Sequence, residues 1–171
     1  TGEGLGVRGG SWRERVADAV PRLFSPEACW LVADMLSDNA ARAAAFGLDS
    51  SLRFDFPVAC KTGTSTGFRD NWAFGYTPEF TVGVWVGNFD GSPMNHVSGV
   101  AGAAPILHDL FVHLHDLYGT TWFEPPNAIV ERTVHRLTGK EVRDPGPRVT
   151  ELVRERFQAD NLPPAESDDD Y

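Results

Sequence analysis

The sequence predicts a mixed α/β fold of the α+β kind, in which helices flank an antiparallel sheet. Three strand-like runs follow one another closely, at residues 58–65, 71–76 and 80–88. Connections this short join antiparallel neighbours, so the runs are expected to form a meander. A capped helical segment precedes the meander and an apolar helical stripe follows it, which places helices against the sheet.

The first helix is expected over residues 26–37. Ser25 supplies an N-cap hydroxyl, and Pro26 suits the first helical position. The apolar residues that follow recur at helical spacing and are expected to be buried; they are Ala28, Leu31, Val32, Met35 and Leu36. One or two further helical turns are expected over residues 40–48, ending near Gly47.

A second helix is expected after Gly102, ending at Gly119. Its apolar stripe consists of Ala103, Ile106, Leu107, Leu110, Phe111, Leu114 and Leu117. On the middle strand, Ala73 and Gly75 alternate with larger aromatic residues, so one face of the sheet is small. We expect the helix to lie close against that face.

Length and composition indicate one folded domain and exclude several functions. The chain has 171 residues, 42% of them hydrophobic, and no run of 18 apolar residues. Its net charge of −9 argues against a nucleic-acid partner. The sequence starts at Thr1 rather than at a methionine, so we expect a longer protein whose targeting signal lies outside this chain.

The two cysteines allow either a disulfide or two free thiols. Cys29 falls in a predicted helix and Cys60 in a core-like strand, which favours two buried free thiols. No His or Asp stands near Cys60 at a spacing that would activate it, so a nucleophilic role is not expected.

Lys61 is unusual because charged residues are depleted in strands of this kind. It can belong to an edge strand, where its charge prevents aggregation. In the functional interpretation, Thr62 and Thr64 add hydroxyls, and Gly63 lets another backbone approach the strand edge. Such an edge would bind an extended peptide that ends in a carboxylate, with Arg69 as a second cation nearby.

These residues resemble a known family. Lys61-Thr62-Gly63-Thr64-Ser65, followed by F-R-D-N-W-A-F-G at residues 68–75, is similar to the K-T-G strand and next hairpin of penicillin-binding protein transpeptidase domains. The strand ending at Gly87-Asn88, the helix from Ala103, and the motifs P-P at 125–126 and T-G-K at 138–140 also resemble class A bifunctional members of the 1C type. The resemblance covers most of residues 20–160.

The resemblance implies a fold like that of the serine β-lactamases and penicillin-binding proteins, present here as a partial domain. Residues 1–119 would be the carboxyl-terminal part of the transpeptidase domain, and residues 120–171 a tail. The implied activity is that of a peptidoglycan D,D-transpeptidase, in which a serine attacks D-Ala-D-Ala stem peptides and an amine accepts the acyl group. The implied location is the periplasmic face, with an inner-membrane anchor in a segment absent from this chain. Class A parents usually also carry a glycosyltransferase.

Site residues follow from the same resemblance. Lys61, Thr62, Gly63 and Thr64 would bind the terminal carboxylate of a stem peptide or of a β-lactam antibiotic. Lys61 and Thr64 would also act in catalysis, Lys61 through its positive field and Thr64 through a main-chain N–H of the oxyanion hole. Asp70 and Trp72 are expected to support the site. The resemblance implies no cofactor and no metal.

The departures from the family pattern limit what this chain can do alone. No serine has a lysine three positions later, so the S-x-x-K nucleophile and base are absent and would lie in a missing amino-terminal part. Ser37-Asp38-Asn39 spells S-D-N, but it ends a packing helix, where these residues are ordinary terminators. A non-catalytic peptide- or β-lactam-binding module, and a related D,D-carboxypeptidase or β-lactamase-like hydrolase, remain alternatives.

Two further expectations concern the helix histidines and the tail. The histidines of the covering helix, His108, His113 and His115, are expected to be solvated rather than metal-bound. Residues 129–134, a turn at 137–140 and residues 141–143 are expected to form a hairpin. The acidic end after Pro163-Pro164 is expected to be disordered.

Overall fold

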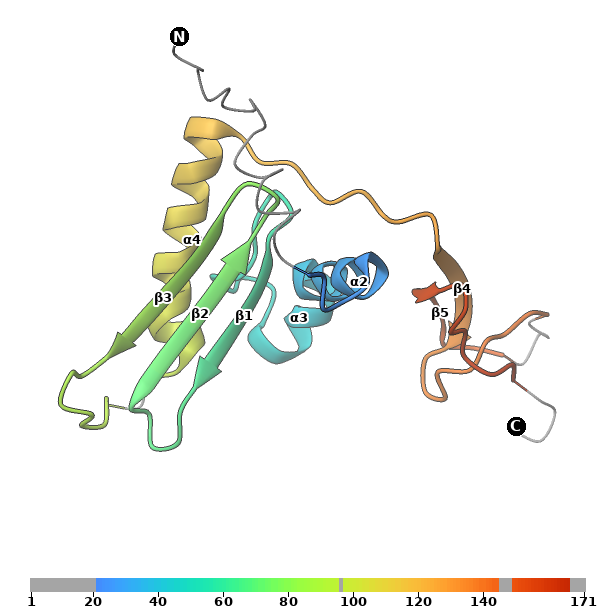
Figure 1. The fold of residues 1–171 in the computed structure, drawn as a ribbon. Coiled ribbons are helices and arrows are strands. Elements are labelled where there is room, and N and C mark those ends of the chain that lie inside the picture. Colours follow the sequence, from blue (N-terminus) through green and yellow to red (C-terminus); the bar gives the residue numbers. More distant parts are fainter. Residues whose placement is uncertain (1–20, 96, 145–148, 167–171) are drawn as a thin grey trace, which may run out of the picture.

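The computed structural model describes residues 21–95, 97–144 and 149–166. In chain order these residues form two short helices, a three-stranded sheet, a long helix and a two-stranded sheet (Figure 1). The fold is therefore α+β with antiparallel sheets.

The three-stranded sheet is the predicted meander. It contains β1 (Ala59–Thr64), β2 (Asp70–Tyr76) and β3 (Thr81–Gly87), in the order β1-β2-β3 with both pairs antiparallel. Thr62 lies opposite Ala73, and Ala73 lies opposite Val84. This order leaves β1 at one edge of the sheet.

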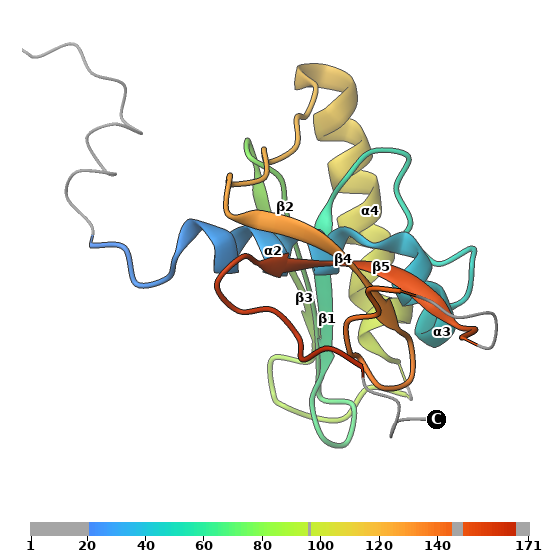
Figure 2. The same cartoon turned by 90° about the vertical axis from the view of Figure 1, so that its right-hand side faces the viewer.

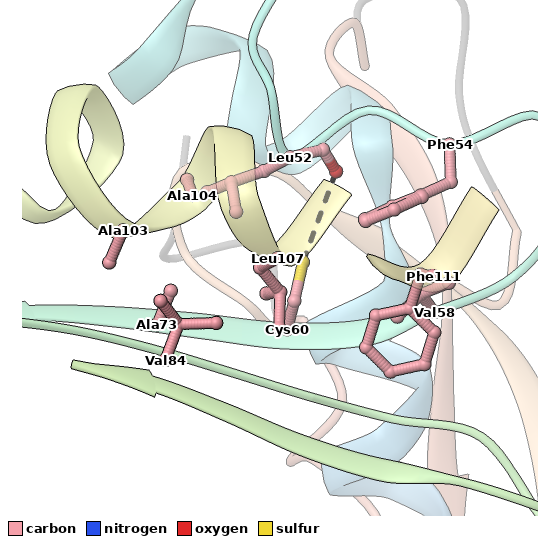
Figure 3. Close-up of a cluster of buried hydrophobic side chains, with 10 residues drawn as sticks. All are labelled: Leu52, Phe54, Val58, Cys60, Ala73, Val84, Ala103, Ala104, Leu107 and Phe111. Atoms are coloured by element: carbon pink, nitrogen blue, oxygen red, sulfur yellow. Dashed lines mark hydrogen bonds between the residues drawn. The ribbon is translucent and has the colours of Figure 1, made fainter. Parts of the chain in front are cut away.

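The long helix α4 (Gly99–Tyr118) covers the face of the sheet that carries the small residues of β2, as predicted (Figures 1 and 2). A Cβ atom on Gly75 would lie 2.5 Å from the Phe111 ring, so only glycine permits this approach. The buried cluster between helix, sheet and the loop before β1 is drawn in Figure 3; it comprises Leu52, Phe54, Val58, Cys60, Ala73, Val84, Ala103, Ala104, Leu107 and Phe111.

Two details of α4 differ from the prediction. The helix begins at Gly99 rather than after Gly102. Part of the predicted buried stripe is also exposed, namely Ile106, Leu110 and Leu117. A three-stranded sheet covers only one side of the helix, so the narrower stripe of Ala103, Leu107 and Phe111 meets it.

Helices α2 (Pro26–Ser37) and α3 (Asn39–Phe46) lie on the other side of β1 from β2 (Figure 1). The predicted cap of α2 is confirmed, because the Ser25 hydroxyl accepts a hydrogen bond from the Ala28 N–H at 3.1 Å. Gly47 ends α3 with a φ of 80°, as the sequence suggested.

The predicted buried stripe of α2 is wrong. Val32 and Met35 are exposed, and the buried residues are Trp30 and Ala33. The Trp30 indole N–H donates to the Phe123 carbonyl at 3.0 Å, which turns this side of the helix toward the segment after α4. Apolar spacing alone did not identify which side of the helix finds a partner.

The predicted tail hairpin is only partly correct. β4 (Ile129–His135) pairs along its length with β5 (Leu152–Gln158), whereas residues 141–143 contribute a single bridge between Glu141 and Val134. The start of the acidic end is also ordered, because the Glu166 N–H donates to the Glu141 carbonyl at 2.8 Å. The rest of that predicted disordered end, and the predicted loop at the amino terminus, lie outside the described residues.

Both cysteines are free, as predicted, but Cys29 is exposed rather than buried. It lies on the side of α2 away from the sheet core, whereas Cys60 belongs to that core. No helix within the described ranges has the length and apolar character needed to cross a membrane.

Candidate functional site

The candidate site is the open edge of β1. Among the described residues, no strand pairs with the edge of β1 that faces away from β2. The Ser65 N–H donates to the Asp70 carbonyl at 2.9 Å, and main-chain pairing alternates along an antiparallel ladder. The main-chain groups of Thr62 and Thr64 therefore point toward the open edge, while those of Gly63 point toward β2.

Lys61 is exposed and lies opposite Phe74 in the ladder. Its ammonium donates a hydrogen bond to the carbonyl of Thr62, a group that the alternation places at the open edge. The cation, the Thr62 carbonyl and the Thr64 N–H are thus gathered along one strand margin.

Thr64 is tied to the first turn of α4. The Gly99 N–H donates to the Thr64 hydroxyl oxygen at 2.9 Å, across 35 positions of sequence. Sequence reasoning did not identify Gly99, because nothing in the local pattern shows which backbone approaches Gly63 and Thr64.

Asp70 and Trp72 occupy supporting positions. The Asp70 carboxylate accepts a hydrogen bond from the Trp85 indole N–H at 3.0 Å, which joins β2 to β3. The rings of Trp72 and Phe74 stack with centroids 5.2 Å apart, on the sheet face opposite α4. Both are about half exposed, so this face of the sheet is open and aromatic.

Cys60 has the features of a packed core thiol. Burial raises the pKa of Cys60 above its ordinary value, although the neighbouring Arg42 guanidinium acts in the opposite direction. A thiol that resists ionisation is a poor nucleophile, which agrees with the sequence interpretation.

The S-D-N run ends a helix, as the sequence predicted. The Asp38 carboxylate accepts hydrogen bonds from the N–H groups of Ala40 and Ala41, at 2.8 and 3.0 Å. Asp38 therefore joins α2 to α3 as the N-cap of the second helix.

Two of the helix histidines are packed rather than solvated. His108 stacks on Phe54 with ring centroids 4.8 Å apart, and His115 stacks on Phe56 at 3.9 Å. The prediction failed because the loop before β1 folds over this flank of α4 and supplies the aromatic partners. His113 is exposed, as expected. Within the described parts of the chain, no group of three or more metal-binding side chains could hold an ion.

A cavity of about 620 Å³ lies apart from the strand edge, between α2, the segment after α4 and the hairpin. Trp30, Trp122 and Arg156 line it, together with Glu124 and Glu131. The four residues from Lys61 to Thr64 do not, so they form an open margin and not part of this cavity.

Comparison with known proteins gives consistent relatives. No protein-family model matches the chain. Penicillin-binding protein 1C of Escherichia coli (strain K12) is 38% identical over 88 residues, which are 52% of this chain and 11% of that protein. Penicillin-binding protein 1A of Clostridium novyi (strain NT) is 27% identical over 145 residues, 83% of this chain and 16% of that protein.

A solved structure shows a similar fold. The crystal structure of penicillin-binding protein 1A from Haemophilus influenzae superposes with a TM-score of 0.61 at 23% identity, covering 84% of this chain and 22% of that one. At this identity the likeness concerns the fold alone.

Together these matches relate part of the chain to penicillin-binding proteins. More narrowly, the homology is to class A members of the 1A and 1C types. The chain spans only 11% and 16% of the length of the two curated relatives named above.

Proposed function

We propose that this chain is the carboxyl-terminal portion of a serine D,D-transpeptidase that cross-links peptidoglycan. The observation that carries the proposal is the K-T-G-T run on an edge strand whose outer margin is unpaired among the described residues. In this proposal residues 1–119 belong to the transpeptidase domain and residues 120–171 to a tail. A preceding segment of a longer, membrane-anchored extracytoplasmic protein supplies the nucleophilic serine and its lysine.

The strand margin has the groups that carboxylate binding requires. Lys61 provides a cation, and Thr62 and Thr64 provide hydroxyls close to it along β1. A stem peptide ending in D-Ala-D-Ala, or a β-lactam, would lie along β1 as an added strand and place its carboxylate among these groups.

The Thr64 N–H has a second role in this proposal. It points away from β2 and is therefore available as one donor to the oxyanion that forms when the serine attacks the peptide carbonyl. The acyl-enzyme then releases D-alanine, and an amine attacks the acyl carbonyl to form the cross-link and regenerate the serine.

Acylation by a labelled penicillin tests the proposal. In the full-length protein, Lys61→Ala is expected to slow acylation about a hundredfold, since it removes a charged partner of the ligand carboxylate. Lys140→Ala is the matched control, because Lys140 is the only other lysine, and it should leave the rate unchanged. Equal rates for wild type and Lys61→Ala would contradict the carboxylate-binding role.

The 171-residue chain by itself is expected to form no covalent adduct, because it contains no S-x-x-K sequence. A stable labelled band on this chain would show that the nucleophile lies within it and would overturn the division of labour proposed above. Release of acid product to water, without transfer to an added amine, would instead identify a hydrolase of the carboxypeptidase kind.

A further inference from the structure

The start of α4 makes an unusually close contact with the candidate site. Gly99 is the first helical residue, and a Cβ atom added to it would lie 2.9 Å from the Gly63 carbonyl oxygen and 3.2 Å from that of Trp72. Both obstacles are backbone atoms of the sheet, which cannot rotate away as a side chain would. The helix terminus therefore rests directly on the strand that carries Lys61 to Thr64.

A buried amide fixes the same junction from the other side. Asn71 lies opposite Thr64 in the ladder and is fully buried. Its Nδ2 donates to the Val97 carbonyl at 2.7 Å, two residues before the helix begins. The segment leading into α4 is thereby held against β2 beside Thr64.

This junction determines the direction of the Thr64 hydroxyl proton. A hydroxyl has one proton to donate and two lone pairs. The Gly99 N–H occupies one lone pair, so the proton must point away from the helix terminus. Within the described ranges no acceptor takes this proton, and Thr64 is exposed, so the hydroxyl is available as a donor to a ligand.

The helix terminus also makes that donor stronger. Ser98 caps α4 without a side-chain hydrogen bond, so the first-turn N–H groups carry the partial positive charge of a helix start. A hydroxyl that accepts from such a group is polarised, and its own proton becomes a better donor to an anion.

We propose that Gly99 is a positioning residue that makes Thr64 a fixed hydroxyl donor and thereby favours ligands with a free carboxylate over neutral analogues. The inference rests on the proposed function, because it assumes that the ligand carboxylate meets Thr64. Gly99 itself touches no reacting atom; it acts through the hydroxyl of Thr64.

A pair of substitutions at one position separates the hydrogen bond from the packing. Gly99→Ala and Gly99→Pro both add a Cβ, but only proline removes the N–H. Proline suits the first helical position, and Ser98 has the extended conformation (φ −86°, ψ 163°) that a residue before proline requires. The comparison of the two variants therefore isolates the donor.

The measurement is the carboxylate preference of the full-length protein. It is the ratio of acylation rates for a labelled penicillin and for its methyl ester, in which the carboxylate is neutral. Gly99→Ala is expected to lower both rates and keep the ratio. Gly99→Pro is expected to lower the ratio about tenfold relative to Gly99→Ala, the effect of one hydrogen bond to a charged group.

Substitutions of Thr64 give an independent readout should the proline variant fail to fold. Thr64→Val removes the hydroxyl at nearly constant shape and should lower the ratio at least as much, whereas Thr64→Ser should retain it. An unchanged ratio in Thr64→Val, or equal ratios in Gly99→Pro and Gly99→Ala, would overturn the inference while leaving the proposed function intact. A wild-type protein that shows no carboxylate preference would contradict the proposed function itself.

Discussion

The sheet region and the C-terminal hairpin are stabilised by different forces. Between α4 and the three-stranded sheet the contacts are apolar, and Leu107 and Phe111 are fully buried. The β4–β5 hairpin instead has few buried apolar residues, Val134 and Val142 among them, and it is laced with ion pairs. Salt and charge changes should therefore affect the hairpin, and cavities should affect the sheet region.

This contrast matters for the candidate site. The strand edge lies in the region held by the apolar core, so its geometry should persist when the hairpin is perturbed. The hairpin contacts that region mainly through Arg156, whose guanidinium pairs with Asp34 at 2.9 Å and lies 5.7 Å from the centre of the Trp30 ring. The two regions are thus joined by a contact that can be weakened without altering the core.

The largest effect is expected from Phe111→Ala. The Phe111 ring is fully buried against Gly75 and Leu107, so its removal leaves a cavity and should cost about 3–5 kcal/mol of unfolding free energy. Leu110→Ala is the control on the same helix; Leu110 is 42% exposed, and its loss should cost less than about 1 kcal/mol. Urea denaturation followed by circular dichroism measures both, and equal losses would show that the core lies elsewhere.

The second effect concerns the hairpin alone. Glu141 is buried, and its carboxylate lies 3.1 Å from the Arg132 guanidinium and 2.9 Å from that of Arg143. Glu141→Gln keeps the shape but removes the charge, and should cost about 1–3 kcal/mol of local stability.

Hydrogen exchange of the β4 and β5 amides measures this loss, and the β1–β3 amides should not change. Glu151→Gln serves as the control, because its partner Arg136 is 3.9 Å away and both side chains are more than half exposed. Faster exchange throughout the sheet region after Glu141→Gln would show that the two regions unfold as one.

The sequence predicted the elements whose signals are local. Ser25 and Pro26 marked the start of α2 by cap chemistry, and the alternation of small and aromatic residues on β2 indicated the face that α4 covers. The position of Lys61 on an edge strand also followed from composition, since a charge is tolerated there. These features depend on neighbours a few residues apart.

The features that the sequence did not predict depend on distant partners. β5 carries Arg154, Glu155 and Arg156 in a row, so it lacks an apolar alternation, and only its pairing with β4 makes it a strand. Val32 and Met35 are exposed because α2 meets the rest of the chain through Trp30. In the candidate site, the bond from Gly99 to Thr64 joins residues 35 positions apart.

The third effect is on the contact between the two regions. Arg156→Ala removes the pair with Asp34 and the contact with the Trp30 ring, and should cost about 1 kcal/mol. The environment of the Trp30 indole should change, and the difference between variant and wild type should shrink at high salt as the pair is screened.

Tryptophan fluorescence and denaturation at two salt concentrations measure this effect. Arg154→Ala is the matched control on the same strand, since Arg154 is 81% exposed and 3.9 Å from Glu131. A salt-independent loss in Arg156→Ala would mean that packing on Trp30, and not charge, holds the hairpin in place.

The smallest effect is the pH dependence that Cys60 gives to the sheet region. Burial raises the pKa of the folded Cys60 thiol, so above about pH 9 the unfolded chain ionises while the folded chain stays protonated. The folded state then binds more protons, and its stability should fall as pH rises from about 9 toward the folded pKa. Cys60→Ala should flatten this slope.

The range from about pH 9 to 10 gives the clearest test of that slope, because burial also raises the pKa of Tyr76 and its contribution begins above pH 10. Thiol labelling provides the structural control: exposed Cys29 should react at once in the native protein, and Cys60 only on unfolding. Equal slopes in wild type and Cys60→Ala would mean that the thiol is hydrated in the folded state, and rapid labelling of Cys60 would place the opening within the apolar region and not at the hairpin.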